Sequence, residues 1–346
     1  MKSFPPAAQP DLIFCLHASA AFQYFNAGVE LGVFDLFEAH PSLTLSQVAE
    51  STDLSLESTR CLLFGLSALN LVIREGDFFY NSAAISLVFK RGEWKLLQAM
   101  TRFQAHIVYL GLNDFVKSLK EDRNAGLERI EGQGETLYQR LLTNPAIEKI
   151  FFEYMETYSD FAIKYLIKNL DLSSARHVLD VGGGMGRNAI AIASRYPNAQ
   201  VTLLDLQFVI QRAEPLISQH GLSERIKLQP CDITKEEFPG GQDCILFIHQ
   251  LVIWSHEENI KLLKKAFTAL NPEGRVVIFS SVADNDETGP LMAALDTAYF
   301  RAVAAGDGMI YPWKDYEQAL LETGFKNVEY IRCDSWTPHG IIVGYK

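Results

Sequence analysis

A strand that runs directly into a cluster of glycines constrains the fold of this chain more than any other feature. The apolar run Val178–Val181 is followed by glycines at 182, 183, 184 and 186, and a helical pattern occupies 188–195. Glycines between a strand and a helix permit positive φ angles and let a ligand approach the bare backbone. The sequence therefore predicts an α/β fold with a ligand site at this turn.

Acidic residues stand at the ends of three predicted strands. Asp180 closes the first strand, Asp205 ends the second, and Asp232 follows the third. Ligands of open parallel sheets bind at the carboxyl ends of strands, and an acid about twenty residues beyond the glycines accepts hydrogen bonds from ribose hydroxyls. We therefore expect Asp205 and Leu206 at a ribose; Asp232 and Ile233 are expected at an adenine. Aspartates at strand ends also cap turns and helices, which is the alternative role for each.

Asp180 also indicates which nucleotide-like ligand binds. Read from Gly182, the dinucleotide pattern G-x-G-x-x-G fails at Arg187, and read from Gly184 it meets only the looser form that ends in alanine. A carboxylate before the glycines would repel a pyrophosphate but attract a cation. S-adenosyl-L-methionine carries a sulfonium and an ammonium group, so we expect Asp180, Gly182, Gly184 and Gly186 to bind it.

Length and charge limit the classes of function. A chain of 346 residues is long enough for two domains, because single cores stop growing near about 250–300 residues. The net charge of −11 argues against non-specific nucleic-acid binding, which needs a positive surface. No apolar run has the length of a membrane span, the first ten residues lack a signal-peptide core, and five scattered cysteines fit a reducing compartment. We expect a cytoplasmic protein.

The N-terminal part has the pattern of a winged helix. Helical segments are predicted within 12–38, 44–50 and 56–69, and a hairpin follows at 71–80. Only Arg60 and Arg74 are basic between residues 12 and 89, so a dimerising role is favoured over DNA binding.

Three regions are expected along the chain. An all-α winged-helix dimerisation domain with its hairpin covers 12–90, a helical connecting region covers 91–170, and a Rossmann-like domain covers 171–346. In the last region strands alternate with helices, which predicts five parallel strands followed by a terminal antiparallel pair.

Several motifs together resemble one family. They are Glu30–Asp35, Asp180–Gly186, Leu204–Leu206, Trp254–Glu258 and Asn271–Arg275. On these motifs the chain resembles the class I S-adenosylmethionine-dependent methyltransferases of the plant caffeate and bacterial O-methyltransferase-like family, over about residues 12–346. The resemblance implies a homodimer, a bound methyl donor and a small-molecule acceptor.

The fourth-strand motif departs from the family pattern. Family members have L-H-D-W-(S/P)-D-E there, and the histidine removes the proton of an acceptor hydroxyl. The corresponding segment here is Leu251–Glu257, which places Val252 at the position of the base and His256 at a later acidic position. Valine accepts no proton, so simple O-methylation of a phenol is in doubt.

His249, directly after the strand 244–248, is the candidate replacement for that base. This part of the chain also resembles the C-methylating branch of the family, which acts on 2-oxo acids such as phenylpyruvate and uses histidines to hold a divalent metal. Such a metal would stabilise an enolate. A second ligand would have to be Asp296 or His339. The alternative role for His249 is a structural one, satisfied by a backbone carbonyl.

The acceptor pocket is expected to be aromatic. Trp254, Tyr299 and Tyr311 are the predicted walls, although core packing would also explain such residues. Arg301 or Arg102 could bind a substrate carboxylate through two hydrogen bonds.

We thus expect a homodimeric methyltransferase that uses S-adenosyl-L-methionine on a small molecule. C-methylation of a 2-oxo acid or similar enolisable compound is favoured, with His249 as base or metal ligand. O-methylation of a phenolic or hydroxylated metabolite is the alternative. A winged-helix regulator that binds the cofactor and DNA is a third, remote hypothesis.

Overall fold

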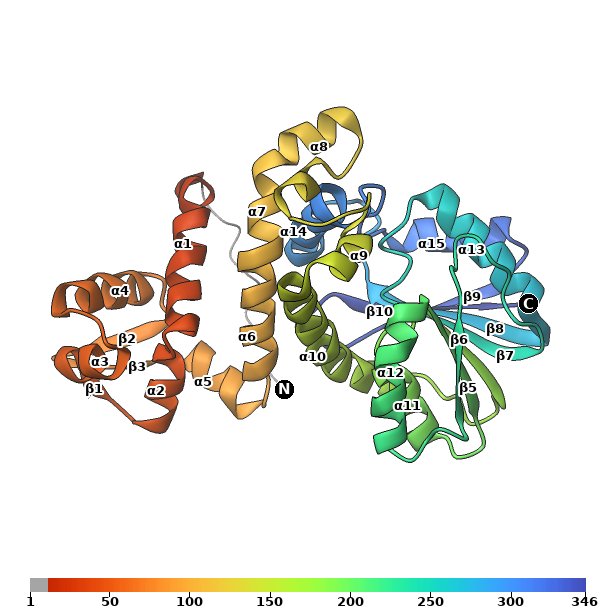
Figure 1. The fold of residues 1–346 in the computed structure, drawn as a ribbon, viewed down its shortest axis with the longest axis horizontal. Coiled ribbons are helices and arrows are strands. Elements are labelled where there is room, and N and C mark those ends of the chain that lie inside the picture. Colours follow the sequence, from red (N-terminus) through yellow and green to blue (C-terminus); the bar gives the residue numbers. More distant parts are fainter. Residues whose placement is uncertain (1–11) are drawn as a thin grey trace. The chain divides into compact units, whose positions relative to one another are not determined.

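The computed structural model describes residues 12–346, which form two compact units, 12–106 and 107–346 (Figure 1). The expectation that no signal peptide is present concerns residues that lie outside the described part. The division at residue 106 falls within the expected connecting region. Among the described residues, no helix is long and apolar enough to cross a membrane.

The N-terminal unit consists of six helices and three short strands. The helices are α1 (Leu12–Glu30), α2 (Val33–Ala39), α3 (Leu45–Thr52), α4 (Leu56–Ala68), α5 (Ala83–Lys90) and α6 (Trp94–Phe103). The strands are β1 (Leu43–Thr44), β2 (Val72–Glu75) and β3 (Phe78–Asn81), paired antiparallel in the order β1-β3-β2. The expected hairpin is present, and β1 adds a third strand that the sequence did not indicate.

Local signals and apolar packing explain this unit. Thr44 and Gln47 form a capping box at the start of α3, and the Ser55 hydroxyl caps α4. The core contains Val33, Phe34, Phe37, Leu63 and Leu66, all nearly inaccessible to solvent. Nε1 of Trp94 donates a 2.8 Å hydrogen bond to the carboxylate of Asp35, which ties α6 to α2. Asp35 therefore has a structural role in the motif 30–35.

The second unit surrounds one sheet of seven strands. Its helices are α7 (Tyr109–Gly111), α8 (Phe115–Glu121), α9 (Leu137–Arg140), α10 (Pro145–Asn169), α11 (Arg187–Arg195), α12 (Gln207–Gln219), α13 (His256–Ala269), α14 (Leu291–Tyr299) and α15 (Trp313–Glu322). Its strands are β4 (His177–Val181), β5 (Gln200–Asp205), β6 (Ile226–Pro230), β7 (Gln242–Ile248), β8 (Leu270–Ser281), β9 (Lys326–Arg332) and β10 (His339–Tyr345). Helices α11 and α12 cover one face of the sheet, and α13 and α15 cover the other (Figure 1).

The strand order positions the ligand site. The sheet has the order β6-β5-β4-β7-β8-β10-β9, in which β4 to β8 are parallel and β10 is antiparallel to both its neighbours. The chain proceeds outward from β4 to β6 and then returns to the other side of β4 with β7. Such a reversal opens a crevice at the carboxyl ends of β4 and β7. The expected Rossmann-like sheet is confirmed.

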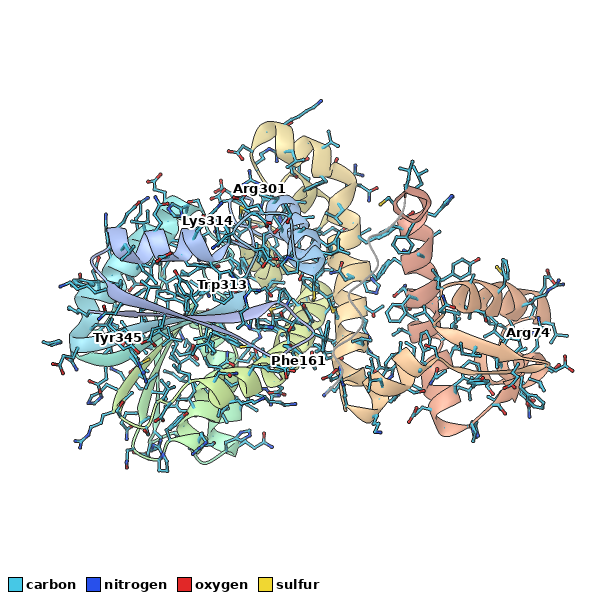
Figure 2. All side chains as sticks on the ribbon, turned by 180° about the vertical axis from the view of Figure 1, so that it is seen from behind. Arg74, Phe161, Arg301, Trp313, Lys314 and Tyr345 are labelled. Carbon is cyan, nitrogen blue, oxygen red and sulfur yellow. The ribbon has the colours of Figure 1, made fainter. Side chains whose placement is uncertain are left out.

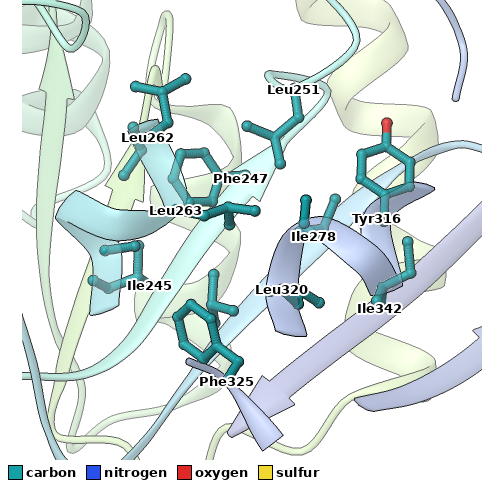
Figure 3. Packing of buried hydrophobic residues seen from close by; sticks show 14 of the residues in the cluster. Ile245, Phe247, Leu251, Leu262, Leu263, Ile278, Tyr316, Leu320, Phe325 and Ile342 are labelled. Atoms are coloured by element: carbon teal, nitrogen blue, oxygen red, sulfur yellow. The ribbon is translucent and has the colours of Figure 1, made fainter. Parts of the chain in front are cut away.

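Apolar strands buried on both faces hold this sheet in place. Ile245 and Phe247 of β7 pack with Leu262 and Leu263 of α13, and Phe325, which follows α15, belongs to the same cluster (Figure 3). All five side chains are almost fully buried. Continuous apolar runs of this kind are typical of parallel strands with helices on both sides.

Candidate active site

Glycine is required at the turn between β4 and α11 for two reasons. Gly182, Gly184 and Gly186 have φ angles of 69°, 56° and 79°, in the left-handed region that favours glycine. A Cβ on Gly182 would also lie 1.8 Å from Nε2 of Gln250, so no larger residue fits there. At Gly184 a Cβ would meet nothing within 4 Å, and the backbone of the turn is therefore open at this position.

Asp180 lies buried beneath this turn without a partner. Its side chain is inaccessible to solvent, and neither carboxyl oxygen has a hydrogen-bond partner among the described residues. Burial, followed by the nearby charge of Asp205, raises the pKa of Asp180 to about 7. A buried carboxyl group without a partner favours a cationic ligand beside it. This observation fits the ammonium or sulfonium group of S-adenosylmethionine.

Asp205, at the end of β5, binds the glycine turn. Its carboxylate accepts hydrogen bonds from the backbone N–H of Gly184 at 2.8 Å and of Leu206 at 2.7 Å. Burial raises the pKa of Asp205 to about 6, although these two N–H groups lower it in part. Leu206 occupies the position before α12. The contact of both residues with a ribose remains a prediction, which the remaining lone pairs of Asp205 allow.

Asp232 caps its own turn. Its carboxylate accepts hydrogen bonds from the hydroxyl and the N–H of Thr234, and it pairs with Nζ of Lys235 at 2.9 Å. Burial acts to raise the pKa of Asp232, but the hydrogen bonds from Lys235 and Thr234 outweigh it and lower the pKa. Ile233 is buried in the core. The alternative structural role of Asp232 is therefore present, and the adenine contact of both residues stays a prediction.

His249 follows β7 in a strained backbone conformation. Its φ angle is 55°, which costs a residue other than glycine about 1–3 kcal/mol, and its N–H donates to the carbonyl of Phe279 at 2.8 Å. Nε2 of the ring is buried and has no hydrogen-bond partner, so no backbone carbonyl satisfies this atom. Burial lowers the pKa of His249 to about 4. The imidazole is therefore neutral at pH 7 and can accept a proton.

His339 and Tyr158 complete a cluster around His249. The two imidazole rings have centroids 5.0 Å apart, and the Tyr158 ring lies 5.1 Å from that of His249. The Tyr158 hydroxyl is 3.4 Å from Nε2 of His339, whose Nδ1 contacts the Thr337 hydroxyl. Burial, and then the neighbouring His249, lower the pKa of His339 well below its usual value. His339 was expected only as a metal ligand, and Tyr158 was missed because nothing near it in the sequence indicates chemistry.

The donor set does not fit a divalent metal. Within residues 12–346, no group of three or more histidine, cysteine or acidic side chains is arranged to hold an ion. His249 and His339 alone supply two ligands, whereas catalytic sites generally use three.

The predicted aromatic walls are joined by hydrogen bonds. Nε1 of Trp254 donates to Gln250 at 3.2 Å, and the Tyr311 hydroxyl donates to the backbone carbonyl of Trp254 at 2.7 Å. Tyr299 bonds to Tyr138, and the Tyr299 side chain is buried. These contacts connect Gln250, which lies against the glycine turn, with Trp254 and Tyr311. Contact of any of these walls with an acceptor remains a prediction.

Arg301 is occupied by an ion pair. It lies in the π-helical turn Phe300–Ala304 that follows α14 (Figure 2), and its guanidinium pairs with Asp122 at the end of α8. This pair satisfies the charge that was expected to bind a substrate carboxylate. The other candidate, Arg102, belongs to α6 in the N-terminal unit.

Comparison with known proteins identifies the family. Residues 12–91 match the O-methyltransferase dimerisation domain, and residues 109–326 match the O-methyltransferase domain. The chain belongs to the O-methyltransferase family. It is therefore a methyltransferase that uses S-adenosylmethionine on a small molecule, and the match of its N-terminal domain confirms the expected homodimer.

Two relatives and two solved structures indicate the range of this family. The chain is 38% identical to L-tyrosine C(3)-methyltransferase of Streptomyces lavendulae over 343 residues, 99% of this chain and 94% of the relative. It is 30% identical to 3-hydroxy-5-methyl-1-naphthoate 3-O-methyltransferase of Streptomyces sahachiroi, over 57% of this chain and 56% of the relative. The S-adenosylmethionine-dependent methyltransferase SibL superposes with a TM-score of 0.86 at 38% identity, covering 97% of this chain and 98% of that one. Human N-acetylserotonin methyltransferase shares the fold, with a TM-score of 0.81 at 23% identity, over 98% of this chain and 99% of that one.

Proposed function

We propose that this methyltransferase transfers the methyl group to a carbon atom of a phenol, ortho to the hydroxyl, and not to the oxygen. The observation that carries the proposal is the buried, neutral pair His249 and His339, which stands beside β7 where O-methylating relatives place a single base. Val252, at the position of that base, is buried and has no proton acceptor. The relative whose name states C-methylation of tyrosine supports the same reaction class.

A phenol has the reactivity expected of an enolisable acceptor. Its hydroxyl carbon and ortho carbon are an enol within an aromatic ring, and the ortho carbon becomes more nucleophilic as the hydroxyl proton is withdrawn. Nε2 of His249 is neutral and unbonded, so it can accept that proton. Tyr158 and Thr337 bond to the two ring nitrogens of His339 and hold this second imidazole in position.

When bound, S-adenosylmethionine supplies an electrophilic methyl group on a sulfonium. Asp180 would hold its cationic end, and the open backbone at Gly184 leaves room for it. With the donor bound, Nε2 of His249 would take the hydroxyl proton while the ortho carbon takes the methyl group, and the sulfur would leave as the thioether S-adenosylhomocysteine. The ring would then lose its ortho hydrogen as a proton, and the oxygen would regain a proton from His249. The ring is aromatic again, and one proton is released in the whole reaction. Alignment of the reacting atoms supplies much of the rate.

A 2-oxo acid is the second candidate acceptor. Its enol tautomer presents the same pair of hydroxyl and nucleophilic carbon to the two histidines. The ion pair between Arg301 and Asp122 disfavours a 2-oxo acid, because the guanidinium that was expected to bind the substrate carboxylate is already neutralised.

Two acceptors distinguish C-methylation of a phenol from C-methylation of a 2-oxo acid. 4-Hydroxyphenylpyruvate contains a phenol and an enolisable 2-oxo acid, and L-tyrosine contains the phenol alone. Each would be incubated with the dimer and donor labelled with carbon-13 in the methyl group, and the product would be analysed by NMR. We expect an aryl methyl group from a phenolic substrate. An aliphatic methyl group would support the 2-oxo acid, and a methoxy group would overturn C-methylation.

A further inference from the structure

Lys265 of α13 holds the turn that follows β6. Its ammonium donates hydrogen bonds to the backbone carbonyls of Ile233, Thr234 and Glu236, at 2.9, 3.0 and 2.9 Å. A lysine ammonium has three N–H donors, so these bonds use all of them. Hydrogen bonds from a charged donor are stronger than those between neutral groups. One side chain of a distant helix therefore fixes three carbonyls of a turn that lies outside the regular strands and helices.

The same turn is joined to the end of β5. The N–H of Cys231, which precedes the turn, donates to the backbone carbonyl of Asp205 at 2.9 Å. The carboxylate of Asp205 accepts a hydrogen bond from the N–H of Gly184 in the glycine turn. Asp205 and Gly184 are both expected to bind the methyl donor. The turn 232–236 therefore adjoins them on the side where the adenine of that donor is expected.

The hydrogen bonds inside the turn leave one N–H group without a partner. The carbonyl of Asp232 accepts from the N–H groups of Lys235 and Glu236, at 2.9 and 2.8 Å. The N–H of Asp232 donates to the carboxylate of Glu236, and the N–H of Thr234 donates to the carboxylate of Asp232. Among the described residues, the N–H of Ile233 makes no hydrogen bond.

The geometry of the peptide bond decides where this N–H points. The bond between Asp232 and Ile233 is trans, which holds the N–H of Ile233 opposite to the carbonyl of Asp232. That carbonyl points into the turn, toward Lys235 and Glu236. The N–H of Ile233 therefore points out of the turn, whereas the carbonyls bound to Lys265 point toward α13. An outward N–H is a donor for N1 of adenine, which accepts hydrogen bonds.

We propose that Lys265 is a positioning residue for the methyl donor, which keeps the N–H of Ile233 free and in place to bind the adenine ring. It acts through the turn and not by contact with the donor. This inference goes beyond the reaction proposed above, and it rests on the expected contact between the turn and adenine. Hypoxanthine carries a hydrogen on N1, so it would present a second donor to the N–H of Ile233, and neither donor would be satisfied. The site should therefore select adenine over hypoxanthine.

Matched ligands and variants test this role on the intact homodimer. Lys265→Met removes the ammonium and keeps an aliphatic side chain, and Lys265→Arg keeps a positive charge with several N–H donors. The affinities for S-adenosylhomocysteine and S-inosylhomocysteine would be measured by calorimetry. We expect the wild-type protein to bind the adenine compound at least about tenfold more tightly. Lys265→Met should lose most of this preference, and Lys265→Arg should keep part of it.

Steady-state kinetics supply a second readout. Lys265→Met should raise the KM for S-adenosylmethionine at least about tenfold. The value of kcat at saturating donor should change by less than about threefold, because the adenine lies far from the methyl group that is transferred. Lys264→Met is the matched control, since it removes an exposed ammonium from the same helix and should leave both quantities unchanged.

The base preference distinguishes positioning from a merely structural role. It is a ratio measured within one variant, so a general loss of stability does not alter it. A Lys265→Met variant that weakens both ligands equally, or neither, would overturn the inference. Equal affinity of the wild-type protein for the two ligands would also overturn it.

The two proposals fail separately. An unaltered base preference in Lys265→Met removes the role of Lys265 and leaves C-methylation intact. A methoxy product removes C-methylation, and the effect of Lys265 on the binding of adenine would remain.

Discussion

His249 combines three properties that are rare together in one residue. Its backbone has a positive φ, its Nε2 atom is buried, and that atom has no hydrogen-bond partner. Each of these is unfavourable for the folded protein, and strain of this kind persists where the surrounding structure maintains it. Asp180 is likewise a buried acid without a partner. The residues with backbone strain or with buried polar atoms that lack hydrogen-bond partners therefore lie around the site where the ligands are expected.

Replacement of His249 tests the role of its imidazole. His249→Ala should lower kcat by about 10²- to 10⁴-fold, because a proton acceptor in the reaction is lost. Affinity for S-adenosylhomocysteine should stay the same. Both quantities can be measured on one preparation by labelled-methyl transfer and calorimetry.

His256→Ala provides the matched control. This histidine starts α13 and is partly exposed, so its removal should change kcat by less than about threefold. An equal loss in both variants would contradict the role of His249.

At the scale of elements, strands and their ends were the most predictable part of this protein. All seven strands of the large sheet were expected from the sequence, although β8 begins at Leu270 and not at the predicted Arg275. Apolar runs bounded by glycine, proline and aspartate are local signals, and they do not depend on the rest of the fold. The strand β1 was missed because two residues, Leu43 and Thr44, are too few to show a period.

The glycine turn allows a test at this scale. In Gly182→Ala, the added Cβ would displace the Gln250 side chain, which bonds to Trp254. The positive φ alone costs about 1–2 kcal/mol of unfolding free energy. We expect that loss in urea unfolding, together with an affinity for S-adenosylhomocysteine at least about tenfold weaker.

Gly221→Ala separates the clash from the backbone effect. Gly221 has a φ of 66°, and a Cβ there would meet nothing within 4 Å. It should show the loss of unfolding free energy without the loss of affinity. Equal affinities for the two variants would show that displacement of Gln250 has no effect on binding.

At the scale of the whole molecule, the dimerisation domain and the candidate active site lie in different folded units. Residues 12–106 contain the dimerisation domain, and residues 107–346 contain the sheet, both carboxylates beneath the turn and the histidine pair. Within the second unit the residues expected to bind the donor stand at the ends of β4 and β5, whereas Tyr158 comes from α10. The stability of this unit is therefore coupled to the charges it buries.

The pH dependence of stability tests this coupling through Asp180. Its pKa of about 7 in the folded protein lies above the ordinary value of 3.8, so the folded chain holds a proton that the unfolded chain releases. The stability from this carboxyl is complete below pH 3.8 and is lost as the pH rises through about 7. Asp180→Asn should therefore raise the unfolding free energy of the ligand-free protein at pH 8, by roughly 4 kcal/mol.

The same substitution should have little effect on unfolding free energy near pH 4, where Asp180 is protonated in the folded state. The titration of His249 and His339 occurs in both proteins and cancels in the difference. Urea unfolding of the two proteins at both pH values gives the comparison. A difference that is the same at both pH values would contradict the raised pKa.

The sequence alone determined the order of strands and helices, the glycine turn and the acids at the strand ends, because local periodicity and turn chemistry specify them. It also indicated His249 through the valine at the position of the usual base. Only the tertiary structure decided that His339 and Tyr158 join His249, that Arg301 is neutralised by Asp122, and that Asp180 stays unpaired. Partnership and burial depend on which distant segments the sheet and its helices bring together, and no local pattern in the sequence encodes that.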